Sequence, residues 1–503
     1  MRIGWPDRKM GKGSKKAGRA MFSGTSAMDF DLLYQLSYMS VIASSGVPRK
    51  LIFERAAEVD CAAAESFRKV ELACQTLKYD YAKACKVVAE STEEPSIKEI
   101  LLRFSSSMIS GEPEGDFLAR EATAQANNYT NTYDRKLETL KMWTDGYVSL
   151  ILSSVLVIIM GIVSTMIWTV NSLFLMGLVT VSVGTTALGV WLLYLVVPRE
   201  IMIPRQADSR EQKLTRKMFR FSMLPTLVLC AALLLTQSNL GWVLLAIAAM
   251  AFPTGYMSSI GDRKVIKRDG EAGPFIASLG GVCTAIGSTV KEGLGRIDLD
   301  SLNMLRPEIR RLSVRLRTGI GTRLCWKKFT EETGSELIRR SIGMFCDAVE
   351  IGGVPEEAGH HASLFTTRIA LLRSRRRNVS TPFSWLCWTM HTAVIALLVF
   401  VTEVIGTFGE MLGQAQGSMP DISGASTMNM FTTFSFSGLE LMKSLLLPLI
   451  VVFTVSNALA PAIAEGGDRY RILQSLTMTT VVSGICLICL PPVAAGLFQS
   501  IQR

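Results

Sequence analysis

The sequence lacks the motifs that mark the common enzyme classes. It has no glycine-rich loop ending in the lysine that contacts nucleotide phosphates, no serine elbow and no zincin motif. Histidine is scarce: His360 and His361 are adjacent and cannot share one helical face, and His391 lies in an apolar segment. The ten cysteines have no metal-ligand spacing, and Cys486 and Cys489 ("CLIC") are apolar filler. We therefore expect a protein that is not an enzyme, without catalytic residues, metal or cofactor.

Long segments of the chain also lack charge. Residues 147–198 contain no Asp, Glu, Lys or Arg, and neither do residues 221–261. Because one crossing of a bilayer needs about 20 apolar residues, each segment is long enough for two transmembrane helices. Three further apolar segments, at about 385–405, 444–464 and 475–498, bring the expected number of spans to seven. With 49% hydrophobic residues, the composition predicts a multi-pass membrane protein.

The charges between the apolar segments predict the orientation. The loop 199–220 has seven Lys or Arg against three acids, and residues 262–384 have 21 against 14. Residues 407–442 contain three acids and no basic residue. Since basic loops stay on the cytoplasmic side, we expect the N-terminus in the cytoplasm, the C-terminus outside, and the protein in the cytoplasmic membrane.

Two further expectations concern the N-terminal residues and the charge within the spans. Residues 1–28 hold seven basic groups against one acid and no apolar segment, so we expect a disordered basic arm near anionic lipid and no cleavable signal peptide. Glu403 is the only clear ionisable side chain within the spans, near the outer end of its helix. This disfavours a proton-coupled transporter, which normally needs buried carboxylates or histidines near midplane, and leaves a carrier of a neutral solute open.

Two cytoplasmic segments remain when the spans are removed. Residues 29–146 and 262–384 are each large enough for a small domain, and neither shows strand alternation. The first has 19 acids against 14 bases and is rich in helix-forming residues. We therefore predict an all-α membrane protein with about seven transmembrane helices and two cytoplasmic helical-bundle domains. Its expected parts are a basic arm 1–28, a first domain 29–146, four spans in 147–261, a second domain 262–384, and three spans in 385–503.

A small-Gly-Val-Pro bend occurs once in each cytoplasmic segment. We expect Gly46 and Gly353 to take the left-handed conformation that closes a helix, with Pro48 and Pro355 in the first turn of the next helix. A further break, "SGEPEG", contains Gly111. The alternative is that Gly-Val-Pro is a common connector without further meaning.

One helix of the second segment combines an apolar stripe with many arginines. Leu305, Ile309, Leu312, Leu316 and Ile320 share one face. The candidate partner-binding residues cover the rest of the helix: Arg306, Arg310, Arg311, Arg315 and Arg317. Such a helix could dock an acidic protein, lie on the bilayer surface, or be the solvated face of a bundle. The run "RSRRR" at 373–377 is explained by anchoring of the next span.

Three strings carry a family resemblance: "LLYQLSYMSVIASSGVPRKLIFERAA", "MISGEPEGDFLAREA" and "MFCDAVEIGGVPEEAGHHASLFTTRIALLRSRRR". With the arrangement of domains and spans, they resemble the type II secretion F family, the platform proteins of type IV pili, and in particular the archaellum platform. Bacterial members generally have three spans, so seven is similar to the archaeal branch. The second bend corresponds either to Gly46 or to the family's later Gly-Glu bend at Gly111 and Glu112.

The resemblance implies a non-enzymatic platform in the cell membrane. It would couple a hexameric secretion ATPase to the insertion of pilin-like or archaellin subunits into a filament, or to related secretion. The expected partners are that ATPase, the subunits, the lipid membrane and a second copy of the chain, and nucleic acid is not among them. A transporter of a neutral solute is the alternative, and a membrane receptor is a third possibility.

Overall fold

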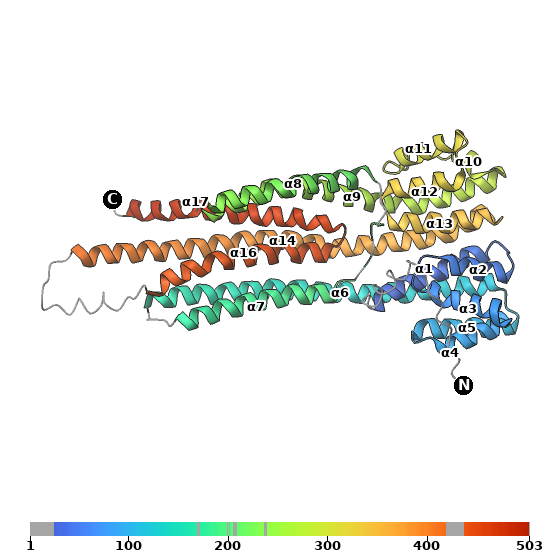
Figure 1. Cartoon of the computed structure of the whole chain (residues 1–503), viewed down its shortest axis with the longest axis horizontal. Helices are drawn as coiled ribbons and strands as arrows, with labels where there is room; N and C mark the ends of the chain where they lie inside the picture. Colours follow the sequence, from blue (N-terminus) through green and yellow to red (C-terminus); the bar gives the residue numbers. More distant parts are fainter. Residues whose placement is uncertain are drawn as a thin grey trace. The chain divides into compact units, whose positions relative to one another are not determined.

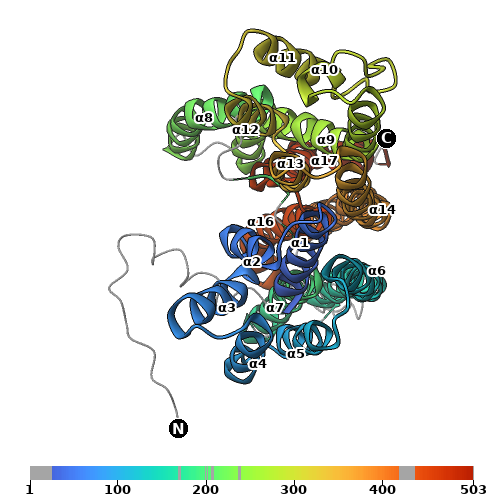
Figure 2. The same cartoon turned by 90° about the vertical axis from the view of Figure 1, so that its right-hand side faces the viewer.

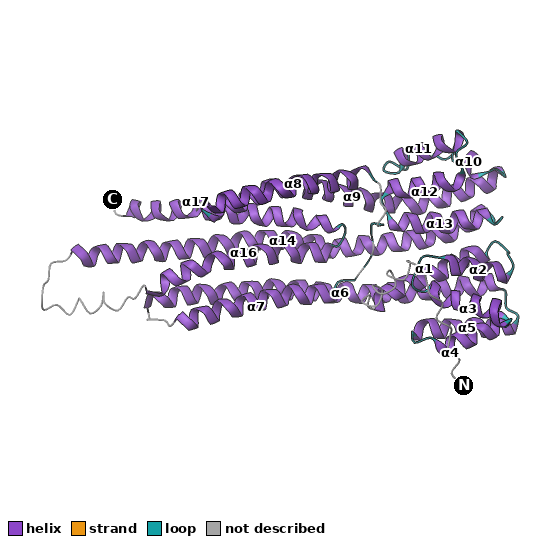
Figure 3. Cartoon of the chain, viewed as in Figure 1, coloured by secondary structure: helices purple, strands orange, loops and turns teal. Residues whose placement is uncertain are grey.

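The computed structural model of the chain describes residues 25–167, 172–198, 200, 202–204, 209–235, 239–418 and 437–501. Helices are the only regular secondary structure in those residues, as Figure 3 shows. The predicted all-α class is therefore confirmed. Most of the expected basic arm and the centre of the expected external loop, residues 419–436, lie outside the described residues.

The helices follow one another as two short-helix series separated by long helices (Figure 1). The first series is α1 (Thr25–Ala43), α2 (Arg49–Glu58), α3 (Ala64–Leu77), α4 (Tyr81–Ser91) and α5 (Pro95–Ser110). Then come α6 (Glu114–Ile167), α7 (Ser172–Val196), α8 (Arg210–Leu235) and α9 (Leu240–Ile286). The second series is α10 (Val290–Gly293), α11 (Arg306–Arg317), α12 (Thr322–Thr333) and α13 (Glu336–Glu350). The chain ends with α14 (Pro355–Ser418), α16 (Ser437–Glu465), the 3-10 turn η2 (Arg469–Arg471) and α17 (Ile472–Ile501).

The chain divides into two compact units. The first unit comprises the described residues of 1–134, 198–207 and 265–372, and the second comprises those of 135–197, 208–264 and 373–503. Both predicted cytoplasmic segments therefore contribute to the first unit, and the predicted spans contribute to the second. Three helices, α6, α9 and α14, have residues in both units. The bounds of two separate cytoplasmic domains stay a prediction.

Six helices of the described residues are long and apolar enough to cross a membrane: α6, α7, α9, α14, α16 and α17. The helix α8 was expected as a further span and is not among them. It is helical through Pro225, and Phe221, Leu224 and Leu227 are each more than 70% exposed. Such apolar exposure suits a lipid-facing helix. The structure thus supports six candidate spans, and the seventh and the orientation of the termini stay predictions.

Close backbone approaches bring helices of the second unit together. A Cβ atom built on Gly255 of α9 would lie 2.5 Å from the backbone nitrogen of Gln474 in α17. Further along the same pair, a Cβ on Gly241 would lie 3.0 Å from the carbonyl oxygen of Gly484. Small residues let apolar helices pack at this range, where dispersion and weak backbone contacts stabilise the pair. In the same unit, α16 packs against both α7 and α17.

The first of the two predicted cytoplasmic segments has an aromatic core. Phe53 of α2 stacks on Tyr81 of α4 and on Phe104 of α5, with ring centroids 4.6 and 5.4 Å apart. Phe104 in turn stacks on Phe117 of α6 at 5.0 Å. Each such pair stabilises by about 1 kcal/mol beyond the area that it buries. The start of α6 is therefore fixed on the bundle formed by α2 to α5.

Within the first unit, α1 packs against α13 and so joins the two predicted cytoplasmic segments (Figure 2). The guanidinium of Arg340 is 3.0 Å from an Asp31 carboxylate oxygen, and it stacks over the rings of Phe30 and Tyr34. One side of this contact carries charge and the other aromatic faces, so the buried cation is stabilised by both. The segments lie side by side within this unit.

Two of the predicted bends have the expected backbone. Gly46 has φ +67° and closes α1, while Gly111 has φ +76° and closes α5. Pro48 is the N-cap of α2 and so precedes its first turn. Left-handed φ costs a side-chain-bearing residue about 1 kcal/mol or more, which explains glycine at both positions.

The third bend corrects one prediction. The left-handed residue after α13 is Gly352, with φ +93°, and not Gly353. The helix ends in a Schellman motif: the Gly353 N–H donates to the Ala348 carbonyl and the Gly352 N–H to that of Val349. Gly353 is needed for space instead, because a Cβ there would lie 2.0 Å from Ser45 Oγ. Pro355 is the first residue of α14, as expected.

The element order also bears on the register of the repeat. The bend at Gly352 ends a short helix and leads into α14, a helix that continues into the second unit. The bend at Gly111 does the same for α5 and α6, whereas the bend at Gly46 leads into the short α2. Gly111 is therefore the better counterpart of the second bend.

Candidate docking surface on α11

The helix α11 is positioned by its apolar stripe and by a carboxylate at its start. Both backbone N–H groups that precede it, those of Met304 and Leu305, donate to Glu271 of α9 at 2.9 Å. These groups have no partner within a helix, and an anion there also complements the helix dipole. Of the predicted stripe, Leu305, Ile309, Leu312 and Leu316 are buried. Ile320 is not part of it: it lies beyond the end of α11 and is 43% exposed.

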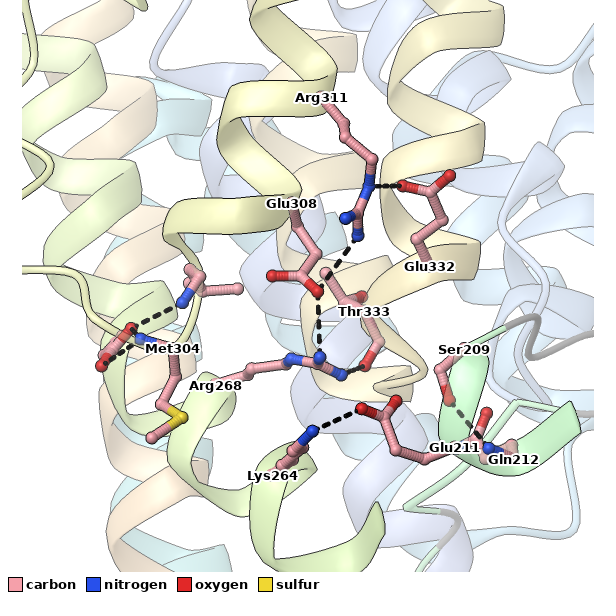
Figure 4. Close-up of polar contacts among 12 residues, drawn as sticks. Ser209, Glu211, Gln212, Lys264, Arg268, Met304, Glu308, Arg311, Glu332 and Thr333 are labelled. Atoms are coloured by element: carbon pink, nitrogen blue, oxygen red, sulfur yellow. Dashed lines mark hydrogen bonds and ion pairs between the residues drawn. The ribbon is translucent and has the colours of Figure 1, made fainter. Parts of the chain in front are cut away.

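A buried ion pair lies beneath α11. Arg268 of α9 donates to the Glu308 carboxylate at 2.9 Å and to the Thr333 carbonyl oxygen at 3.1 Å (Figure 4). The side chains of Arg268 and Glu308 are 7% and 4% exposed. These contacts tie three helices together, because Arg268 lies in α9, Glu308 in α11 and Thr333 at the end of α12.

Two of the five candidate arginines belong to this internal network. Arg311 donates to Glu308 at 3.2 Å and to Glu332 of α12 at 3.0 Å, and Arg315 donates to the other oxygen of Glu332. Burial raises the pKa of the Glu332 carboxyl, but the bonds from Arg315 and Arg311 outweigh it, and the pKa lies below its ordinary value. Arg311 and Arg315 therefore hold α11 on α12.

The other three arginines face outward. Arg306, Arg310 and Arg317, which we call the arginine face, are exposed, and Arg306 pairs with Asp300 at 3.2 Å on the surface. Within the described part of the chain, neither Arg310 nor Arg317 has an ion pair. Arg306 and Arg310 line a surface hollow together with Val314, which is 55% exposed. This arrangement can bind carboxylates beside an apolar contact, and it offers no group for bond making or breaking.

The second unit has its own polar contacts at the ends of its helices. Lys264 of α9 is 2.7 Å from Glu211 of α8 (Figure 4). Arg376, from the run expected only to anchor a span, donates to the carbonyl oxygens of Ala464 and Ile463 at 3.1 and 3.3 Å. It thus closes the C-terminus of α16, where carbonyls lack helical partners.

Asp262 holds the loop that follows α16. Its carboxylate accepts the Asp468 backbone N–H at 3.3 Å and lies 3.5 Å from Arg471, which pairs more closely with Glu465. Burial raises the pKa of Asp262 to about 6, although Arg471 acts in the opposite direction.

One polar cluster was missed at the sequence level. His391, set aside there as an isolated histidine, is hydrogen-bonded in the second unit to Asn457 and Ser483. The available signal was an amide or hydroxyl in each of three uncharged segments of the sequence, which spacing alone could not pair. For metals, no group of three or more His, Cys, Asp or Glu suited to an ion occurs in the ranges that the structure describes.

The fold and these sites define an all-α, multi-pass membrane protein whose described residues form two compact units. Flagella accessory protein J of Methanocaldococcus jannaschii is 21% identical over 422 residues, which cover 81% of this chain and 73% of that protein. Flagella accessory protein J of Methanococcus voltae is 22% identical over 447 residues, or 84% of this chain and 77% of that protein. The chain is therefore a distant homologue of archaeal flagella accessory protein J. No family model matches it, and no solved structure does.

Proposed function

We propose that this chain is the membrane platform that couples a cytoplasmic secretion ATPase to assembly of an archaellum or a related type IV pilus-like filament. The observation that carries the proposal is the homology, which extends over more than four fifths of the chain and hence over both units. The structure adds a reason: α6, α9 and α14 are candidate spans that each also have residues in the first unit. A displacement of the first unit by a motor would be transmitted along these helices.

The arginine face is the proposed contact with the ATPase. Its guanidinium groups require an acidic partner surface, and the contact should weaken with salt because the groups are exposed. Arg311 and Arg315 are excluded from the test because reversing them would leave Glu332 and Glu308 facing like charge. The test is the triple variant Arg306→Glu, Arg310→Glu and Arg317→Glu in the full-length chain.

The variant should insert into membranes normally and bind the secretion ATPase at least tenfold more weakly at low salt. Each exposed charge contact is worth about 1 kcal/mol or less, and like-charge contacts add to the loss. A matched control reverses three exposed lysines of the first segment, Lys69, Lys86 and Lys98. Equal binding by the triple variant and the wild type would place the motor contact elsewhere, and equal loss in both variants would reduce the effect to net charge.

The transporter alternative predicts a different result. Membrane vesicles containing the chain would accumulate a neutral solute without any ATPase or filament subunit. The proposed platform predicts no such uptake, and the predicted orientation places the first unit on the ATPase side of the membrane. The same vesicles can be used for the binding and the uptake measurements.

A further inference from the structure

A cluster of polar side chains lies inside the second unit where four helices meet. This membrane cluster consists of Tyr147 from α6, His391 from α14, Thr454 and Asn457 from α16, and Thr479 and Ser483 from α17. None of the six is more than 1% exposed. His391 lies near the middle of the uncharged stretch 378–402. A buried ionisable group in such a stretch is costly unless its partners satisfy it.

The hydrogen bonds define one protonation state. The Tyr147 hydroxyl donates to Asn457 Oδ1 at 3.0 Å, so the other side of that amide, Nδ2, faces His391 Nδ1 at 3.1 Å and donates to it. Because Nδ1 accepts, the ring proton is on Nε2, which donates to the Thr479 carbonyl oxygen at 3.2 Å. Ser483 Oγ is 3.0 Å from Nε2 and 2.7 Å from Thr454 Oγ1. Every ring nitrogen is therefore satisfied when His391 is neutral.

A second proton on the ring would disrupt this arrangement of hydrogen bonds. It would place an Nδ1–H donor against the Asn457 amide donor at 3.1 Å. If the amide turned to offer Oδ1, its Nδ2 would face Tyr147, and the hydroxyl would lose the acceptor that it has at 3.0 Å. Either way, one buried donor is left unpaired, which costs about 1–3 kcal/mol.

The surroundings of the ring provide no compensating charge. The groups that face it are Tyr147 from α6, Asn457 and Thr454 from α16, and Thr479 and Ser483 from α17. On its own helix, Cys387 is one turn away and buried. Among the described residues, no Asp, Glu, Lys or Arg acts on the ring electrostatically. A cation here would be buried among neutral groups, which is strongly unfavourable.

We propose that His391 is a proton-controlled latch: the neutral ring ties α14 to α16 and α17, and through Asn457 to α6, and a proton on the ring releases them. All four helices contribute side chains to this network of hydrogen bonds, and a single proton on the ring disrupts it. The proposal does not depend on filament assembly, because it concerns only the coupling of protonation to the packing of the second unit.

The test compares the pH dependence of unfolding of the full-length wild type with that of His391→Gln. Glutamine keeps an acceptor for Asn457 and a donor for Thr479 and takes up no proton. An exposed histidine titrates near pH 6.5, so below about pH 6 the wild type should gain one proton on opening. Its unfolding constant relative to that of the variant should then rise about tenfold for each pH unit between 6 and 5. Asp262 titrates in the same range, but it is present in both proteins and cancels in the ratio.

The other two histidines supply a matched control. Burial lowers the pKa of the His361 ring, so His361 adds its own pH dependence to unfolding. The comparison is therefore repeated in the His360→Gln and His361→Gln background, where the ratio between the protein with His391 and the His391→Gln variant should keep the same slope, because both residues lie in the first unit. A ratio that stays constant from pH 8 to 5, or a slope that disappears in this control, would refute the latch.

A second measurement needs no substitution at His391. In wild-type protein with 13C-labelled histidine, the His391 ring should keep its neutral signal until amide protection in α14 is lost. A ring that takes up its proton while that protection persists would equally overturn the proposal.

Discussion

The buried pair between Arg268 and Glu308 gives the most quantitative prediction about the first unit. Replacing Arg268 with Met removes the donor at 2.9 Å from the Glu308 carboxylate, which is 4% exposed and still accepts a hydrogen bond from Arg311. Breaking a buried pair costs about 3–5 kcal/mol. Since Arg311 still donates at 3.2 Å, we expect about 3 kcal/mol for Arg268→Met.

Hydrogen exchange in the full-length protein measures this cost locally. At 1.36 kcal/mol per tenfold, about 3 kcal/mol corresponds to roughly 100-fold faster exchange of the protected amides of α11 and α12. The double variant Arg268→Met and Glu308→Leu removes both charges, so it should lose less than the sum of the single variants, with a coupling of at least about 2 kcal/mol. Unchanged exchange in Arg268→Met, or additive effects in the double variant, would refute the interpretation of this pair as the support of α11.

Three further predictions follow from the packing, the charges and the topology. Gly280→Ala should lower the free energy of unfolding by at least about 2 kcal/mol, because a Cβ there would lie 2.3 Å from the Pro355 carbonyl oxygen. The neighbouring Gly281→Ala adds a Cβ with nothing within 4 Å, so it should stabilise α9 by up to about 1 kcal/mol. Thermal unfolding of the two variants measures the difference. Asp262→Asn should stabilise the protein by about 2 kcal/mol at pH 8 and give no such gain below pH 4. The pKa of Asp262 in the folded protein, about 6, lies above its ordinary value, so the folded wild type takes up a proton and becomes more stable as the pH falls from 7 to 5. An impermeant thiol reagent added outside should label Glu410→Cys and not Arg210→Cys in a cysteine-free background, both positions being exposed; the reverse pattern would contradict the predicted orientation.

The helical class and the position of the bends could be predicted because their causes are local. Uncharged runs of more than 40 residues admit few structures other than membrane helices, and Gly46 and Gly111 adopt left-handed turns in open space. The third bend was misplaced by one residue. The sequence "GGVP" offers two glycines, and only the packing of Ser45 against Gly353 assigns the left-handed turn to Gly352.

The candidate surface was predicted as a helix, but which of its arginines face outward and which pair with neighbouring helices was not. Periodicity separates Ile309 and Leu312 from the arginines, yet it cannot distinguish Arg311, which meets Glu332, from Arg310, which faces outward. That distinction depends on α12, a helix close in sequence whose packing angle no pattern specifies. For the same reason the membrane cluster was beyond sequence reasoning, since Tyr147 and Asn457 are 310 positions apart.

The measurement that tests the central proposal most directly is filament assembly in the native host after deletion of the gene for this chain. The account predicts that cells lose their surface filaments while the filament subunits accumulate in the membrane, and that the wild-type gene restores the filaments. It further predicts that the triple variant of the arginine face inserts but does not restore them. Deletion cells that still assemble filaments in normal number would contradict the proposed platform function.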